Sequence, residues 1–157
     1  MKTETQTRLG TDQTIDTYAD GSIRVTTVQK PAPATPSGVH VNASIGSCTT
    51  VSSSHYDATY RCTVSTNVVV SNAAYTVTYH QVQGAASSIT ANSPLTTSCS
   101  VGACSNKRMV VGRKTQSGNS PAYITGYWTW TAVGGGSSKD YWLEFDVRNG
   151  STWASNN

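Results

Sequence analysis

The chain has 157 residues, a length typical of a single domain. Hydrophobic residues make up 36% of it and charged residues only 12%, while 24 threonines and 21 serines fill the difference. Four tryptophans, eight tyrosines and a net charge of +3 exclude a charge-rich disordered chain. Leu and Glu are too scarce for a coiled coil or a helical bundle, and no apolar stretch is long enough to span a bilayer. The composition therefore predicts a β-rich domain.

Residues 1–38 are polar and carry balanced charges. They contain one strand signal, at 22–28, whose apolar positions are Ile23, Val25 and Val28. Three prolines then follow within 30–38, a pattern typical of an extended linker. This segment is either a frayed tail or an arm that becomes ordered on a partner by adding its strand to the partner's sheet.

Residues 39–157 alternate between apolar and polar side chains, with turn signals between the runs. The runs occupy 39–45, 56–64, 67–72, 74–82, 108–111, 122–133 and 141–147. In the last run we expect Tyr141, Leu143, Phe145 and Val147 to face inward. Six to eight short strands predict an all-β fold, namely an antiparallel β-sandwich of immunoglobulin-like or Greek-key type with an extended N-terminal arm.

The four cysteines, Cys48, Cys62, Cys99 and Cys104, favour two disulfides over a zinc site, because no close Cys pair or Cys–His pair is present. A hairpin that folds at about residue 55 places position 48 opposite position 62, whereas Cys99 and Cys104 enclose a tight turn. Two disulfides predict an oxidising, extracellular location. Residues 1–30 hold no signal-peptide apolar run, so we expect that a leader has been removed.

A hairpin-closing cysteine pair followed by the pair in Cys99-Ser100-Val101-Gly102-Ala103-Cys104 resembles the cysteine layout of the secreted actinobacterial enediyne apoproteins. Those proteins are immunoglobulin-like sandwiches, so the resemblance implies the same architecture here. It covers two short loops only, and no chromophore site is carried over with it.

Catalytic signatures are absent from the sequence: it contains no G-x-S-x-G, and no cysteine is left to pair with a histidine. His55 and His80 are expected to face solvent. Glu144 and Asp146 share one face of one strand, and two acids so placed cannot flank a substrate as glycosidase carboxylates do. We expect them to form a solvated polar face. The sequence therefore predicts no enzyme, no metal and no cofactor.

Two features could form a ligand or partner patch. Lys107, Arg108, Arg113 and Lys114 mark the ends of one short strand, and Trp128 and Trp130 share a face of another. The cations suit an acidic partner or a glycan better than nucleic acid, since no nucleic-acid-binding signature accompanies them. The tryptophans are either core or a platform for stacking sugars.

These observations predict a non-enzymatic, secreted interaction module. In architecture it suits an adaptor or structural subunit of an extracellular assembly, such as a secreted bacterial toxin particle, which docks a protein partner through its arm. One alternative is a carbohydrate- or cell-wall-binding module that uses Trp128, Trp130 and the basic stretch. Another is a secreted protease inhibitor that presents the Cys99–Cys104 loop.

Overall fold

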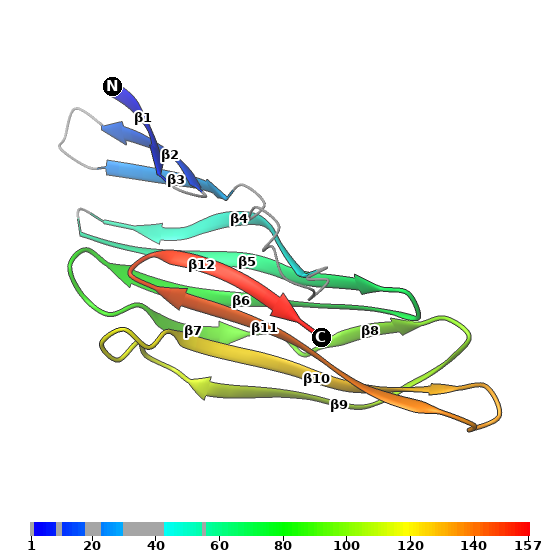
Figure 1. Cartoon of the computed structure of the whole chain (residues 1–157). Coiled ribbons are helices and arrows are strands. Elements are labelled where there is room, and N and C mark those ends of the chain that lie inside the picture. Colours follow the sequence, from blue (N-terminus) through cyan, green and yellow to red (C-terminus); the bar gives the residue numbers. More distant parts are fainter. Residues whose placement is uncertain (1, 9–10, 18–22, 30–42, 55) are drawn as a thin grey trace.

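The computed structural model describes residues 2–8, 11–17, 23–29, 43–54 and 56–157, with side chains described from residue 43 on, Ser47 excepted. All regular structure in these ranges is strand (Figure 1). The strands are β1 Lys2–Arg8, β2 Thr11–Thr17, β3 Ile23–Gln29, β4 Ala43–Ser53, β5 Asp57–Val68, β6 Ser71–Val82, β7 Ser88–Asn92, β8 Thr96–Cys99, β9 Gly102–Arg113, β10 Ala122–Ala132, β11 Ser138–Arg148 and β12 Ser151–Asn156. No helix in these ranges is long and apolar enough to cross a membrane.

Three antiparallel sheets result. A first sheet has the order β4-β5-β6-β7, with β8 beside β6, and a second has the order β12-β11-β10-β9. These two sheets form a sandwich, which confirms the expected all-β class (Figure 1). A third sheet contains β1, β2 and β3, and its last strand lies along β4.

Strict alternation on the long strands supplies the core between the two sheets. The inward positions of the first sheet include Tyr60, Cys62, Val64, Ala73, Tyr75, Val77, Tyr79 and Ile89, and those of the second include Ala122, Ile124, Trp128, Tyr141, Leu143, Phe145 and Val147. The inward set expected for β11 is thus confirmed. Burial of so many aromatic and branched side chains supplies most of the driving force for folding.

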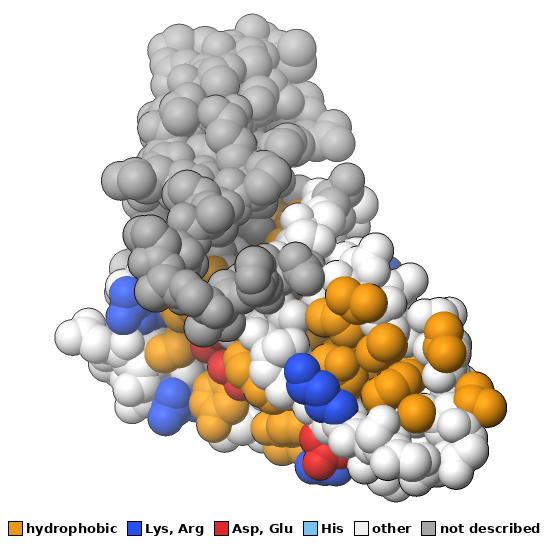
Figure 2. Space-filling model, turned by 45° about the vertical axis from the view of Figure 1, so that its right-hand side comes forward, with side chains coloured by type: hydrophobic (Ala, Val, Ile, Leu, Met, Phe, Trp, Pro, Cys, Tyr) orange, Lys and Arg blue, Asp and Glu red, His pale blue; other side chains and the backbone are white. Residues whose placement is uncertain are grey.

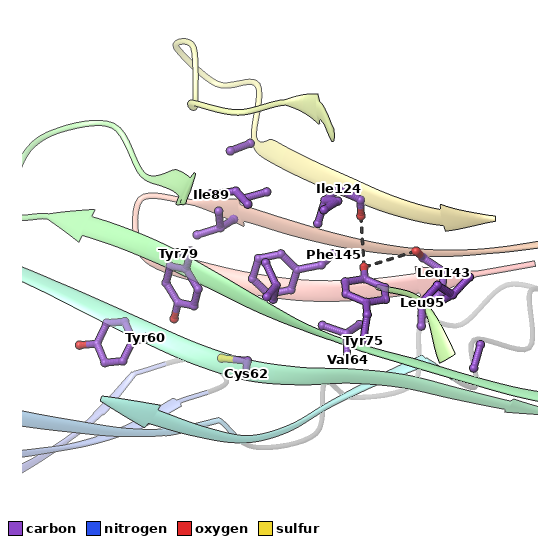
Figure 3. Packing of buried hydrophobic residues seen from close by; sticks show 14 of the residues in the cluster. Tyr60, Cys62, Val64, Tyr75, Tyr79, Ile89, Leu95, Ile124, Leu143 and Phe145 are labelled. Carbon is purple, nitrogen blue, oxygen red and sulfur yellow. Dashed lines mark hydrogen bonds between the residues drawn. The ribbon is translucent and has the colours of Figure 1, made fainter. Parts of the chain in front are cut away.

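A tyrosine bridges the sheets in the middle of this core (Figure 3). The Tyr75 hydroxyl lies 3.2 Å from the carbonyl oxygen of Ile124 and 3.4 Å from that of Leu143, so its proton reaches the opposite sheet. Burial raises the pKa of Tyr75 far above its ordinary value. The ring of Tyr79 lies 5.3 Å from that of Tyr60 and 5.7 Å from that of Phe145, which completes the packing.

Both expected disulfides are present. Cys48 on β4 is bonded to Cys62 on β5, its direct cross-strand partner, and Cys99 is bonded to Cys104 across the turn between β8 and β9. Two disulfides are compatible with an extracellular location.

One side of the sandwich is closed by backbone contacts between the two sheets. After β9 the chain crosses to the first sheet, where the amide of Ile89 donates to the carbonyl of Lys114 at 2.8 Å and the amide of Gln116 donates to Ser87 at 2.9 Å. These bonds join the start of the edge strand β7 to the segment that follows β9, so the edge of the first sheet is covered at this point.

The N-terminal region differs from the sequence expectation in its number of strands. The strand signal at 22–28 corresponds to β3, whereas β1 and β2 were not expected. Their residues are almost all polar, so hydrophobic alternation gave no signal for them. The proline-rich linker expected at 30–38 lies outside the described residues.

Candidate binding surfaces

The two tryptophans of β10 point toward the core. Trp128 is 2% exposed, stacks on Tyr141 with ring centroids 5.5 Å apart, and donates to Ser71 Oγ at 3.0 Å. Trp130 is half-buried and its indole N–H lies 3.3 Å from the carbonyl oxygen of Ser100. Of the two alternatives left open for the tryptophans, Trp128 follows the core one and does not contribute to a surface patch. The alternation of β10 places it between the sheets.

The four cations of the basic stretch do not gather at one point. The strand expected at 108–111 extends over Gly102–Arg113, so Lys107 and Arg108 lie in the middle of β9. Arg113, about 17 Å from Arg108 at the usual rise of a strand, ends β9, and Lys114 follows it. Arg108 lies 4.6 Å from the ring centroid of Tyr127, and Arg113 lies 5.6 Å from that of Tyr123. The stretch thus contributes to two separate cation–π pairs.

The outer face of the second sheet carries the aromatic side chains that sequence reasoning did not select. Tyr123, Tyr127, Trp142 and Trp153 are all half-buried there. Arg148 adds a third cation–π pair, 5.9 Å from the ring of Trp153. The sequence does contain a signal for this face. Aromatic residues occur at both alternating sets of positions on β10, with Tyr123 and Tyr127 on the face opposite Trp128 and Trp130.

The acids of β11 are not a solvated pair, contrary to expectation. Asp146 is only 6% exposed because its cross-strand neighbours on this face are the large side chains of Tyr123 and Trp153. Burial, followed by the nearby charge of Glu144, raises the pKa of Asp146 to about 7. Glu144 accepts a 2.6 Å hydrogen bond from the hydroxyl of Thr125.

A groove of about 650 Å³ opens on the same outer face, across β9, β10 and β11. Its lining includes Asn106, Arg108, Tyr127, Asp140, Trp142 and Asn157. Tyr127 pairs in register with both Arg108 and Trp142, so these three side chains form one rung across the sheet. The groove is therefore built on rigid strands rather than on loops.

A second surface lies at one end of the sandwich, where three turns meet. Each turn presents one exposed valine: Val69 between β5 and β6 is 99% exposed, Val101 between β8 and β9 is 77% exposed, and Val133 between β10 and β11 is 78% exposed. We call these three residues the valine tip. Figure 2, which turns this end forward, shows hydrophobic side chains gathered on the right-hand part of the surface, separated by polar groups.

Hydrogen bonds and a disulfide hold the three turns of the valine tip together. The amide of Ser100 donates to the carbonyl of Val70 at 2.9 Å, and the indole N–H of Trp130 reaches the carbonyl of Ser100. The Cys99–Cys104 disulfide closes the turn that carries Val101. Val101 itself has φ of 54°, a left-handed conformation that is strained for a β-branched residue.

The remaining titratable groups form no further site in the described part of the chain. His80 lies 3.6 Å from the carboxylate of Asp57 on the outer face of the first sheet, and His55 lies outside the described residues. Within the described ranges, no cluster of three or more His, Cys, Asp or Glu side chains is arranged to hold a metal ion.

No family model, curated protein or solved structure matches the chain.

Proposed function

We propose that this chain is a non-enzymatic, secreted interaction module, an adaptor or structural subunit of an extracellular protein assembly, and that it docks a protein partner through the valine tip. The observation that carries the proposal is the exposure of Val69, Val101 and Val133 on three turns that are fixed to one another. Apolar side chains exposed singly are common, but three at one end of a sandwich are typical of an interaction site.

The sequences of the three turns favour a protein surface as the partner. Residues 67–72, 99–104 and 132–138 contain no charged side chain. An uncharged tip gains nothing from the phosphates of nucleic acid or from anionic lipid headgroups. Apolar contacts surrounded by serine, asparagine and backbone groups instead match the usual protein interface, which has an apolar centre and a polar rim.

Strain at Val101 supports the same proposal. A glycine would adopt φ of 54° without cost, and Gly102 follows directly in the chain. A β-branched side chain at this position costs stability, and residues in sparsely populated backbone regions concentrate at functional sites. The disulfide and the contact between Ser100 and Val70 hold the turn in this conformation.

The N-terminal strand β3 is proposed as a second contact. Within the chain, β2 pairs with one side of β3 and β4 lies along the other, so the partner is proposed to contact a face of β3 and not to add a strand at its edge. Ile23, Val25 and Val28 are the apolar positions of this strand. Replacement of both Ile23→Asp and Val25→Asp should weaken partner binding without a change in the melting temperature of the sandwich, as measured by calorimetry. A partner affinity equal to that of the wild type would remove the arm from the proposal.

The experiment that tests the valine tip is affinity capture from the native culture medium with quantitative mass spectrometry. The test variant carries Val69→Ser, Val101→Ser and Val133→Ser. The control variant is Val51→Ser, since Val51 is a half-exposed valine of β4 outside the three turns. The proposal expects a partner that the wild type and the control retain and the triple variant loses. If every captured protein binds the triple variant as well as the wild type, the valine tip is not the docking site.

A further inference from the structure

The geometry points to a saccharide-binding site in the groove on the outer face of the second sheet, formed by Tyr127, Trp142, Asp140, Asn106 and Arg108. This inference is independent of the valine tip, because it rests on different residues. It also differs from the sequence alternative, which placed a sugar platform on Trp128 and Trp130.

The polar side chains of the groove are fixed by one another. Asn106 Nδ2 donates to Thr129 Oγ1 at 3.2 Å, and Thr129 Oγ1 donates to Asp140 Oδ1 at 2.7 Å. Asn157 Nδ2 donates to the Asp140 carbonyl at 3.0 Å, and its Oδ1 accepts from the amide of Trp142 at 2.9 Å. Such a chain holds the carboxylate in one orientation before a ligand arrives, which lowers the entropic cost of binding.

A bulge in β9 brings Asn106 into this network of hydrogen bonds. The register passes from Tyr127↔Arg108 to Thr129↔Ser105, so Asn106 and Lys107 together lie opposite Trp128. Asn106 has φ of 52°, in the left-handed region. Bulges and left-handed residues often occur beside functional sites, where they redirect a side chain. Here they direct the Asn106 amide toward Thr129, into the wall of the groove.

The groups that remain free in the groove define the ligand. Among the described residues, no hydrogen bond reaches Asp140 Oδ2 or Asn106 Oδ1, so both are available as acceptors. The guanidinium of Arg108, lying over the ring of Tyr127, keeps N–H donors at its edge. Donors and acceptors thus alternate beside aromatic rings. Vicinal hydroxyls, each both donor and acceptor, satisfy such an arrangement while the C–H face of the sugar covers an aromatic ring.

The same groups disfavour other ligand classes. Asp140 would repel a phosphate or sulfate, whereas Lys107 and Arg108, which also line the groove, would attract one, so an anionic probe must separate an anionic ligand from a neutral sugar. A purely apolar ligand would bury Asp140 and Asn106 without hydrogen bonds, which is costly. A volume of about 650 Å³ lies within the usual range of small-molecule sites and admits a short oligosaccharide.

The test uses the full chain and nuclear magnetic resonance titration of its amide and indole signals with five probes: cellohexaose, chitohexaose, mannohexaose, maltohexaose and the anionic oligogalacturonate. The inference expects at least one neutral hexasaccharide to shift the signals of Asn106, Thr129 and the Trp142 indole in a saturable way. Asp140→Ala and Tyr127→Ala should each weaken that binding by roughly tenfold or more, the equivalent of one or two lost hydrogen bonds or a lost stacking contact.

Tyr123→Ala is the matched control, because Tyr123 lies on the same face of β10, also has an arginine over its ring, and does not line the groove. It should bind the sugar as the wild type does. The melting temperatures of Asp140→Ala and Tyr127→Ala must equal that of the wild type for their loss of binding to count. If Tyr127→Ala unfolds, the conservative Tyr127→Phe takes its place and should retain binding. Absence of a saturable shift with all four neutral probes up to about 10 mM, where even weak sites bind, would overturn the inference. So would stronger binding of oligogalacturonate, or a loss of binding in Tyr123→Ala alone.

Discussion

The indole N–H of Trp128 on β10 donates a 3.0 Å hydrogen bond to the hydroxyl of Ser71 on β6, and this bond joins the two sheets at the buried base of the valine tip. Both residues are fully enclosed, at 2% and 3% exposure. The Trp128 ring also stacks on Tyr141. One side chain therefore combines aromatic packing with a polar link between sheets.

Replacement of Trp128 by alanine should lower the free energy of unfolding by about 3–5 kcal/mol, the range for a large buried aromatic. Ser71→Ala leaves the indole N–H without its partner and should cost about 1–3 kcal/mol. Urea denaturation followed by circular dichroism measures both. Trp142→Ala, on the outer face, is the control and should cost clearly less. Equal losses for Trp128→Ala and Trp142→Ala would contradict the assignment of Trp128 to the core.

The two disulfides should contribute unequally to stability. In the chain-entropy model, the loop closed by Cys48 and Cys62 corresponds to about 3 kcal/mol and the shorter loop of Cys99 and Cys104 to about 2 kcal/mol. Intact mass should show four hydrogens fewer than the fully reduced chain. Paired alanine variants, compared by denaturation, test the order. Two free thiols in the freshly purified native protein would contradict one of the pairings.

Asp146 should make stability depend on pH. Its pKa is raised to about 7 in the folded state from an ordinary value of 3.8, so the folded chain binds the proton more tightly than the unfolded chain does. This group's contribution is therefore most favourable below pH 4, decreases as pH rises toward 7 and is constant above that. At pH 8, Asp146→Asn should stabilise the fold by roughly 2–4 kcal/mol.

Melting temperatures measured between pH 4 and pH 8 for wild type and Asp146→Asn provide the test for Asp146. The difference between the two proteins should increase across this interval and then level off. Glu144→Gln serves as the comparison, because it removes the second cause of the raised pKa and should shift the wild-type dependence to lower pH. A constant difference at all pH values would show that Asp146 does not titrate in this range.

Gly102 should not tolerate a side chain. A Cβ at this position would meet the backbone oxygen of Thr131 and the indole nitrogen of Trp130, on the neighbouring strand. Gly102→Ala should therefore displace β9 from β10 and lower stability by about 1–3 kcal/mol. Gly136→Ala is the matched control, since nothing lies near its Cβ position. Calorimetry should show little change for Gly136→Ala, and equal melting temperatures for the two variants would refute the close approach.

Local patterns in the sequence determined most of the long strands and both disulfides. They did not predict β8 or β12, and the run expected at 67–72 contains the turn between β5 and β6. The alternation of 56–64 and of 141–147 identified the inward faces of β5 and β11, because a side-chain period of two is a property of any strand. The Cys48–Cys62 pairing followed from hairpin register in the same way. β1 and β2 were missed because polar strands carry no such alternation.

Only the tertiary structure decided where the candidate binding surfaces lie. Alternation showed that Trp128 and Trp130 share a face of β10, but aromatics occupy both faces, so the packing of the second sheet on the first had to select the buried one. The groove depends on a bulge at Asn106 that shifts the register by one residue, and no local sequence pattern indicated it. The valine tip unites turns at 69, 101 and 133, far apart in sequence, because antiparallel pairing brings the ends of β5, β8 and β10 to one end of the sandwich.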